Sequence, residues 1–239
     1  MILYDALTPW YPLLDPVEDH RSEAESYLSA LLRGVDGDAA TLLDLGAGAG
    51  NNAWHLKRRL RCALTDLSEP MLALSRAQNP ECEHLVGDMR SLRLGRLFDA
   101  VLVHDAVTYM TTEEELAAVA ATAFVHTRPG GAAVFAPDDY RDDYAPSTEI
   151  IETDDGDRAL RCLVWSHDPD PSDTTTRTEY VLALREGEAV TVHHDRHVEG
   201  LFPRATWERV LRGAGYAVEW VERVDEEATG QVLLCRRPR

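Results

Sequence analysis

The sequence is poor in basic residues and in long apolar runs. It has 24 Lys and Arg against 42 Asp and Glu, which gives a formal net charge of −18 at pH 7. This much negative charge repels phosphate backbones and anionic membranes, so we expect no nucleic-acid partner. The acidic balance suits a cationic small molecule, and it is equally compatible with a chain that is acidic for no functional reason.

Cysteine is scarce, and so is any sign of export. Cys62, Cys82, Cys162 and Cys235 are far apart and form no C-x-x-C pair, so we interpret them as buried, reduced thiols. The first twenty residues contain three prolines and an early acid, Asp5, without a basic flank or a long apolar run. This is not the pattern of a signal peptide or a membrane anchor, and it predicts a cytoplasmic protein with no membrane partner.

The first 137 residues alternate between strand-like and helix-like patterns. Strand-like segments occur at 41–45, 62–66, 83–88, 98–105 and 132–137. Ser68 and Thr112 stand where each can cap a following helix, and the segment "RPGG" is expected to stop the second of these helices. Repeated strand–helix units predict an α/β fold, a parallel sheet with helices on both of its faces.

The pattern changes after Pro137. Three β-type segments separated by turn-forming residues follow one another at 158–168, 174–186 and 188–200. They predict a small antiparallel β insertion, which would form a lid or a dimer surface, before a last helix and a closing hairpin. We expect a single domain over 1–239, with an N-terminal cap helix region at 1–35 and the insertion at 150–200.

Three glycines, Gly46, Gly48 and Gly50, follow the first strand at intervals of two. Glycines in a strand-to-helix turn let a ligand lie against main-chain N–H groups at the positive end of a helix. The spacing is not the G-x-G-x-x-G of dinucleotide folds, and no Gly-Lys-Ser/Thr follows. It favours a ligand without a pyrophosphate, held by an amino-acid carboxylate and a ribose.

Two acids strengthen this interpretation. Asp66 ends the second strand, where a carboxylate can accept both hydroxyls of a ribose. Asp88 ends the third strand beside Met89, where its carboxylate can accept a hydrogen bond from the exocyclic amine of adenine. Either acid alone would be read as a cap or a turn residue. Together with the glycines, at the carboxyl ends of successive strands, they indicate a nucleoside with an amino-acid tail, S-adenosyl-L-methionine (SAM).

Five segments resemble, in order, the cofactor motifs of class I SAM-dependent methyltransferases. They are "LLDLGAGAG", "LTDLSEPML", "VGDMRSL", "FDAVLVHDAVTYM" and "RPGGAAVFAP". The resemblance covers about residues 40–137 and implies that family's Rossmann-like sheet. Nearly the whole chain is similar, more loosely, to the sugar-amine N,N-dimethyltransferases of antibiotic biosynthesis. The N-terminal "YDALTPWYPLL" is similar to the aromatic segment that folds over the cofactor in that group.

The resemblance implies a set of cofactor-binding residues and no bound metal. The set comprises Tyr11, Asp44, Gly46, Ala47, Gly48, Asp66, Leu67, Met71, Asp88, Met89 and His104. The segment "VHDAVTYM" replaces the serine-containing turn of the sugar-amine enzymes, so the identity of the substrate does not carry over.

The expected catalytic candidates are Tyr109, His104 and Asp105. By resemblance Tyr109 faces the substrate and His104 borders the methionine part of SAM; a half-buried packing tyrosine is the alternative for Tyr109. We expect a small-molecule acceptor and N-methylation of an amine, either an amino sugar or an amino-acid-derived metabolite. An amine must be neutral to attack, and a nearby side chain can take its proton. The alternatives are O-methylation of a hydroxyl or carboxylate, and SAM binding without catalysis.

A run of histidines in "VHHDRHVEG" raises the question of a metal site. In a strand, His193, Asp195 and His197 share one face while His194 points to the other. We favour a polar strand face that lines the acceptor cavity or contacts a second subunit, so a homodimer through the β insertion is a further expectation. The acidic run "PDDYRDDYAP" is expected to be a solvated loop at the mouth of the site.

Overall fold

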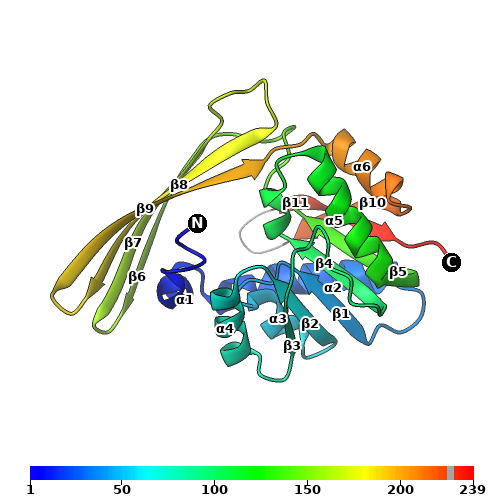
Figure 1. The fold of residues 1–239 in the computed structure, drawn as a ribbon, viewed down its shortest axis with the longest axis horizontal. Coiled ribbons are helices and arrows are strands. Elements are labelled where there is room, and N and C mark those ends of the chain that lie inside the picture. The colour runs from blue at the N-terminus through cyan, green and yellow to red at the C-terminus, as the bar shows by residue number, and fades with distance from the viewer. Residues whose placement is uncertain (225–228) are drawn as a thin grey trace.

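A seven-stranded sheet with helices on both faces carries a separate four-stranded sheet at one side (Figure 1). The structure is a computed structural model that describes residues 1–224 and 229–239. The strand order is β10-β11-β5-β4-β1-β2-β3. The strands are β1 (Thr41–Leu45), β2 (Arg61–Asp66), β3 (Glu83–Val86), β4 (Phe98–His104), β5 (Thr127–Ala136), β10 (Ala217–Val224) and β11 (Thr229–Arg236). β1 to β5 pair in parallel, and β10 and β11 form an antiparallel hairpin, so the predicted fold class is confirmed.

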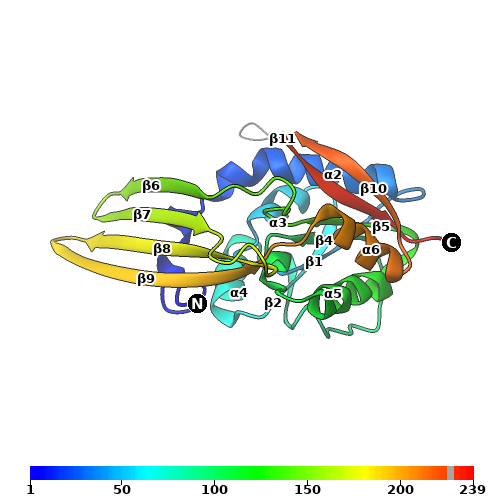
Figure 2. The same cartoon turned by 90° about the horizontal axis from the view of Figure 1, so that it is seen from above.

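The helices pack on the two faces because buried strand residues alternate in direction. The helical elements are η1 (Thr8–Trp10), α1 (Tyr11–Leu14), η2 (Val17–His20), α2 (Arg21–Gly34), α3 (Asn51–Leu56), α4 (Glu69–Gln78), η3 (Ala106–Tyr109), α5 (Glu113–His126) and α6 (Arg204–Gly213). On β4, Ala100 packs in the core under α2 and α3, whereas Val101 packs in the core under α5 and α6 (Figure 2). Among the described residues no helix is both long and apolar enough to span a membrane.

Local signals set several boundaries. The hydroxyl of Ser68 accepts from Met71 N at the start of α4, and that of Thr112 accepts from Glu115 N at the start of α5, so both predicted caps are confirmed. The helix after the glycine turn, α3, is short and ends at Leu56. The expectation for "RPGG" was wrong, because α5 ends at His126 and β5 begins directly at Thr127. Those four residues form an irregularity in the pairing of β4 with β5.

The insertion forms a sheet of its own, as predicted, but it has four strands rather than three. They are β6 (Ser147–Asp155), β7 (Arg158–His167), β8 (Thr175–Glu186) and β9 (Ala189–Gly200), paired antiparallel in that order. Sequence reasoning missed β6 because its residues are mostly exposed and mostly polar, which leaves no alternation to detect. The sheet extends away from the seven-stranded sheet (Figures 1 and 2).

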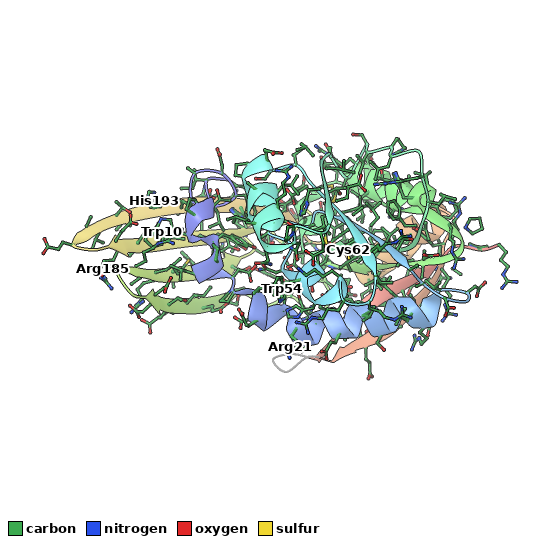
Figure 3. The ribbon with its side chains drawn as sticks, turned by 90° about the horizontal axis from the view of Figure 1, so that it is seen from below. Trp10, Arg21, Trp54, Cys62, Arg185 and His193 are labelled. Atoms are coloured by element: carbon green, nitrogen blue, oxygen red, sulfur yellow. The ribbon has the colours of Figure 1, made fainter. Side chains whose placement is uncertain are left out.

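The N-terminal segment packs against the inner face of the insertion. Its apolar residues Leu3, Leu7 and Leu13 form one core with Leu160 and Leu182 of the sheet. The guanidinium of Arg158 lies 4.1 Å from the ring centre of Trp10 and donates to the carbonyl of Pro9. Figure 3 shows Trp10 beside the strands of the insertion. This core holds the first fourteen residues between the two sheets, over the carboxyl ends of the parallel strands.

Candidate active site

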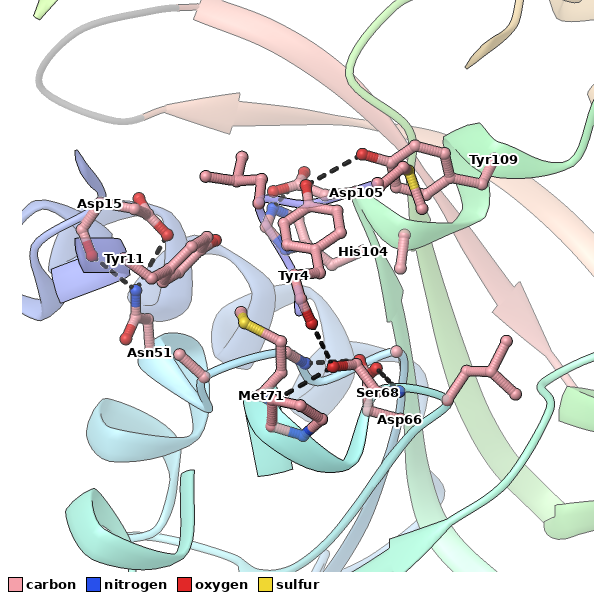
Figure 4. A pocket seen from close by; sticks show the side chains of 18 of the residues that line it. Tyr4, Tyr11, Asp15, Asn51, Asp66, Ser68, Met71, His104, Asp105 and Tyr109 are labelled. Atoms are coloured by element: carbon pink, nitrogen blue, oxygen red, sulfur yellow. Dashed lines mark hydrogen bonds and ion pairs between the residues drawn. The ribbon is translucent and has the colours of Figure 1, made fainter. Parts of the chain in front are cut away.

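A cavity of about 800 Å³ opens at the carboxyl ends of the parallel strands (Figure 4). Its walls come from three parts of the chain: the loops that follow the parallel strands, the N-terminal segment, and the inner face of the insertion. Of the residues predicted from sequence, the following line it: Tyr11, Gly46, Gly48, Asp66, Leu67, Met71, Asp88, Met89, His104, Asp105 and Tyr109. Asp44 and Ala47 do not, and Asp44 is only 3% exposed on β1.

The glycine turn after β1 is tied to the end of β2. Gly48 N donates to Asp66 Oδ2 and Ser68 N donates to Asp66 Oδ1, both at 2.8 Å. Gly46 has φ = +87°, and a Cβ there would overlap the side chains of Ala106 and Met89, so only glycine fits. Burial raises the pKa of Asp66, although these backbone N–H groups oppose the rise. The turn therefore presents main-chain groups and one carboxylate at the floor of the cavity.

Asp88 is less available than expected. Its carboxylate accepts from the guanidinium of Arg90, with Nη2 to Oδ2 at 2.7 Å, and from Arg90 N at 2.8 Å. The neighbouring Arg90 lowers the pKa of Asp88. Glu115 Oε1 holds the other end of the guanidinium at 2.6 Å. Asp88 keeps its place in the cavity wall, but its oxygens already have donors.

A buried polar network at the ends of β1 and β4 was not foreseen. Asn52 Nδ2 donates to Glu23 Oε1 at 2.9 Å and lies 3.2 Å from His104 Nδ1. Asn52 Oδ1 is buried and has no hydrogen-bond partner among the described residues, and Asn52 lines the cavity. An orphaned acceptor at a cavity wall fits a ligand that brings a donor, such as the ammonium group of SAM. The sequence signal for Asn52 was its place just after the glycine turn.

His104 ends β4 between two carboxylates. Its Nε2 lies 2.6 Å from Asp105 Oδ1 and 3.4 Å from Glu23 Oε2. Burial opposes a charge on His104, but Asp105 and Glu23 raise its pKa well above the ordinary value. His104 therefore lies between two acids that favour its charged form, and it is not a free base.

Asp105 and Asp138 form an acid pair after β4 and β5. Among the described residues Asp105 is the only non-glycine with a positive φ, +34°, which marks backbone strain at this turn. Desolvation inside the cavity and the charge of Asp105 raise the pKa of Asp138 above its usual range, although Asp138 keeps exposed surface, and the two carboxyls share a hydrogen bond. His104 lowers the pKa of Asp105 although burial opposes this. The pKa shifts of the two acids therefore run in opposite directions, toward the charged form of Asp105 and the neutral form of Asp138.

Tyr109, at the end of η3, lines the cavity and reaches the insertion. Its hydroxyl lies 2.9 Å from the hydroxyl of Tyr4 and 2.8 Å from His197 Nδ1. His197 Nε2 lies 3.1 Å from Asp195 Oδ2, so the face of β9 that carries residues 195 and 197 turns toward the cavity side. His194 contacts Glu179 on the other face, as the strand pattern predicted. Within the described chain no three metal-ligating side chains cluster closely enough to hold an ion.

Comparisons with known proteins define the class. The family model "Methyltransferase domain" matches residues 42–131. A dTDP-3-amino-3,4,6-trideoxy-alpha-D-glucopyranose N,N-dimethyltransferase of Streptomyces venezuelae is 32% identical over 210 residues, 86% of each chain. A dTDP-3-amino-3,6-dideoxy-alpha-D-glucopyranose N,N-dimethyltransferase of Streptomyces fradiae is 30% identical over 204 residues, 84% of this chain and 79% of the relative.

A solved structure agrees with the sequence relatives. The crystal structure of Streptomyces venezuelae DesVI superposes with a TM-score of 0.82 at 27% identity, covering 98% of this chain and 97% of that one. The chain therefore belongs to the class I SAM-dependent methyltransferases. Within that class it is similar over nearly its full length to amino-sugar N,N-dimethyltransferases, as the sequence motifs indicated.

A charged cluster around His20, in the cavity wall near the N-terminal segment, should make the free energy of unfolding depend on pH. His20 lies 2.7 Å from both Asp15 Oδ1 and Glu23 Oε1. Burial opposes a charge on His20, but these two carboxylates raise its pKa from 6.5 to about 10. Because the folded-state pKa is the higher one, the stabilisation is complete below about pH 6.5 and is lost as the pH rises through about 10.

We therefore expect His20→Gln to lower the free energy of unfolding by about 2 kcal/mol or more at pH 6, the scale of a broken charged pair. The deficit relative to wild type should shrink toward pH 10. Urea unfolding of both proteins at a series of pH values measures it. A deficit that stays constant across the series would contradict the assigned charge on His20.

Proposed function

We propose that this methyltransferase N-methylates the amine of a small amino sugar. The observation that carries the proposal is that Tyr109, Asp138 and Glu199 all line the cavity, which we take as its acceptor half. Carboxylates around a cavity attract and hold an ammonium group. The dTDP-amino-sugar substrates in the names of the two relatives support the same chemistry.

Bound SAM supplies an electrophilic methyl group, and we propose that the chain holds it along the carboxyl edge of the sheet. Asp66 would accept the two ribose hydroxyls, and the backbone of Gly46 and Gly48 would face the amino-acid tail. Asn52 Oδ1, which has no hydrogen-bond partner among the described residues, would accept from the ammonium group. Met71 and the other apolar lining residues named above would border the adenine.

We propose that Asp105 and Asp138 accept the protons that the amine loses during the reaction. An amino sugar reaches the cavity as an ammonium ion, which the charge on Asp105 stabilises until its proton is lost. The nitrogen lone pair can then attack the methyl carbon, and the methylated nitrogen must release a proton afterwards. In the proposed reaction Asp138 carries a proton at rest, and the Asp105 carboxylate, which also pairs with His104, would accept a second. Burial also raises the pKa of Glu199, so this acid is a second acceptor at the same wall.

The function is tested by mass spectrometry of the products. The enzyme is incubated with SAM and an amino sugar, or with the same sugar carrying a hydroxyl in place of the amine. We expect one or two added methyl groups on the amino sugar and none on its hydroxyl counterpart. Methylation of the hydroxyl compound alone would replace this proposal with O-methylation. Calorimetric titration should show binding of SAM and no binding of NAD.

Asp66 gives a direct test of the cofactor site. Asp66→Ala should abolish measurable SAM binding, because two charge-assisted hydrogen bonds of roughly 1.5–3 kcal/mol each are lost. Since Asp66 also anchors Gly48 and Ser68, Asp66→Asn serves as the milder variant that keeps one acceptor oxygen. We expect it to bind SAM at least tenfold more weakly. Calorimetry on both variants, with the exposed Glu81→Gln as control, measures this, and wild-type affinity in Asp66→Asn would remove Asp66 from the site.

Tyr109 should matter for turnover more than for cofactor binding. Tyr109→Phe removes one hydroxyl and keeps the packing of the ring. If that hydroxyl orients the acceptor, the single-turnover rate should fall roughly a hundredfold, the scale of positioned acid–base assistance. SAM affinity should stay within a few fold. Full activity in the variant would reduce Tyr109 to a packing residue.

We also propose a homodimer formed through the outer face of the insertion. Ile150, Leu163 and Val181 pair across three neighbouring strands, and they are 67%, 38% and 40% exposed. Trp165 adds a half-exposed indole beside them. A continuous apolar row on an antiparallel sheet suits a second copy of the same row. Light scattering should give a dimer that Leu163→Glu converts to a monomer, whereas a wild-type monomer at every concentration would contradict the proposal.

A further inference from the structure

His197 is a buried histidine that the reaction outlined above does not use. It lies on β9 with no exposed surface, and it joins two groups from distant parts of the chain. Nδ1 lies 2.8 Å from the hydroxyl of Tyr109, and Nε2 lies 3.1 Å from Asp195 Oδ2. The rings of Tyr180 and Tyr4 pack on the imidazole at 4.7 Å and 5.3 Å between centres. The histidine is thus held in one orientation.

The hydrogen-bond partners of His197 determine which of its two ring nitrogens carries the proton. Asp195 Oδ2 also accepts from Leu3 N at 2.8 Å; burial opposes its charge, but these bonds keep the pKa of Asp195 below its ordinary value. Burial lowers the pKa of His197, so the imidazole is neutral beside a carboxylate. A carboxylate only accepts, so the proton of His197 lies on Nε2 and points to Asp195. Nδ1 is then an acceptor, and the hydroxyl of Tyr109 donates to it.

The direction of these hydrogen bonds leaves the oxygen of Tyr109 with one site at which it can only accept a hydrogen bond. A hydroxyl has one proton and two acceptor sites. The proton is committed to His197, and one acceptor site takes the hydroxyl proton of Tyr4, 2.9 Å away. The second acceptor site remains, and Tyr109 lines the cavity. A tyrosine without this histidine would be free to donate into the cavity instead.

We propose that His197 and Asp195 are positioning residues that fix the Tyr109 oxygen as a hydrogen-bond acceptor for an N–H of the substrate amine. The N–H donated to Tyr109 orients the nitrogen so that its lone pair stays available for the methyl group. A hydroxyl donating from Tyr109 would occupy that lone pair and block the attack. The inference rests on the proposed function, because it needs an amine in the cavity. The arrangement follows the logic of an orienting acid, a histidine and a reacting hydroxyl.

Two variants of His197 separate positioning from simple packing. The amide of Asn at this position lies near the place of Nδ1, so His197→Asn can still accept from Tyr109 but loses Asp195. The amide of Gln reaches the place of Nε2, so His197→Gln keeps a donor for Asp195 and leaves Tyr109 without its acceptor. We expect kcat to fall at least tenfold in His197→Gln, which removes the acceptor of the Tyr109 proton, and to stay within about threefold of wild type in His197→Asn, which keeps that acceptor.

His197→Gln should be more stable to heat than His197→Asn, because it keeps a donor for Asp195, and Asp195 also accepts from Leu3 N of the N-terminal segment. SAM affinity should be unchanged in both. His193→Gln, on the same strand and outside the cavity wall, is the matched control and should behave as wild type. A His197→Gln enzyme with wild-type kcat, or activity that follows stability, would overturn the inference.

The tautomer of His197 can be measured without any substrate. In ¹⁵N NMR of the wild-type protein, His197 should carry its proton on Nε2, and Nδ1 should show the shift of an unprotonated nitrogen. A proton on Nδ1 would overturn the inference directly. If the wild-type enzyme methylates no amine, the proposed function fails on that result alone, whereas this spectrum still decides how Tyr109 is held.

Discussion

The parallel pairing of β1 with β2 and β4 is the constraint on which the rest of the structure depends. Because parallel strands end at one edge of a sheet, this pairing brings the glycine turn, Asp66 and His104 together although they are far apart in sequence. Backbone bonds then fix the edge: Gly46 N and Ala47 N both donate to the carbonyl of Thr65. The strongly apolar strands that form the pairing supply its stability, and the polar groups at the edge supply the chemistry.

The carboxyl edge of the sheet forms only the floor of the cavity, and the other walls come from segments outside the sheet. The insertion turns its inner face toward the edge, and the first fourteen residues fill the space between them. Ser68 Oγ donates to the carbonyl of Tyr4, so the same serine that caps α4 also holds the N-terminal segment. The proposed cofactor and acceptor halves of the cavity therefore share a wall. A cation that enters the acceptor half would meet its acids in a partly enclosed space, where charge interactions are strong.

The parts of the site that could be predicted from sequence are those that are local along the chain. Gly46, Gly48 and Asp66 follow strands directly, so periodicity alone placed them. Glu23 and the link from Tyr109 to His197 could not be foreseen, because α2, η3 and β9 meet only in the folded molecule. Motif resemblance also included Asp44, which lies on β1, and Ala47, which lies in the turn after it; neither residue lines the cavity.

The central claim is that SAM binds along the carboxyl edge beneath the N-terminal segment. Hydrogen–deuterium exchange with and without S-adenosylhomocysteine, the demethylated cofactor, tests it most directly. The account predicts slower exchange in residues 1–15, 46–52 and 66–71, and unchanged exchange at the hairpin that joins β8 to β9. Unchanged exchange at 46–52 and 66–71 in the presence of saturating ligand would contradict it.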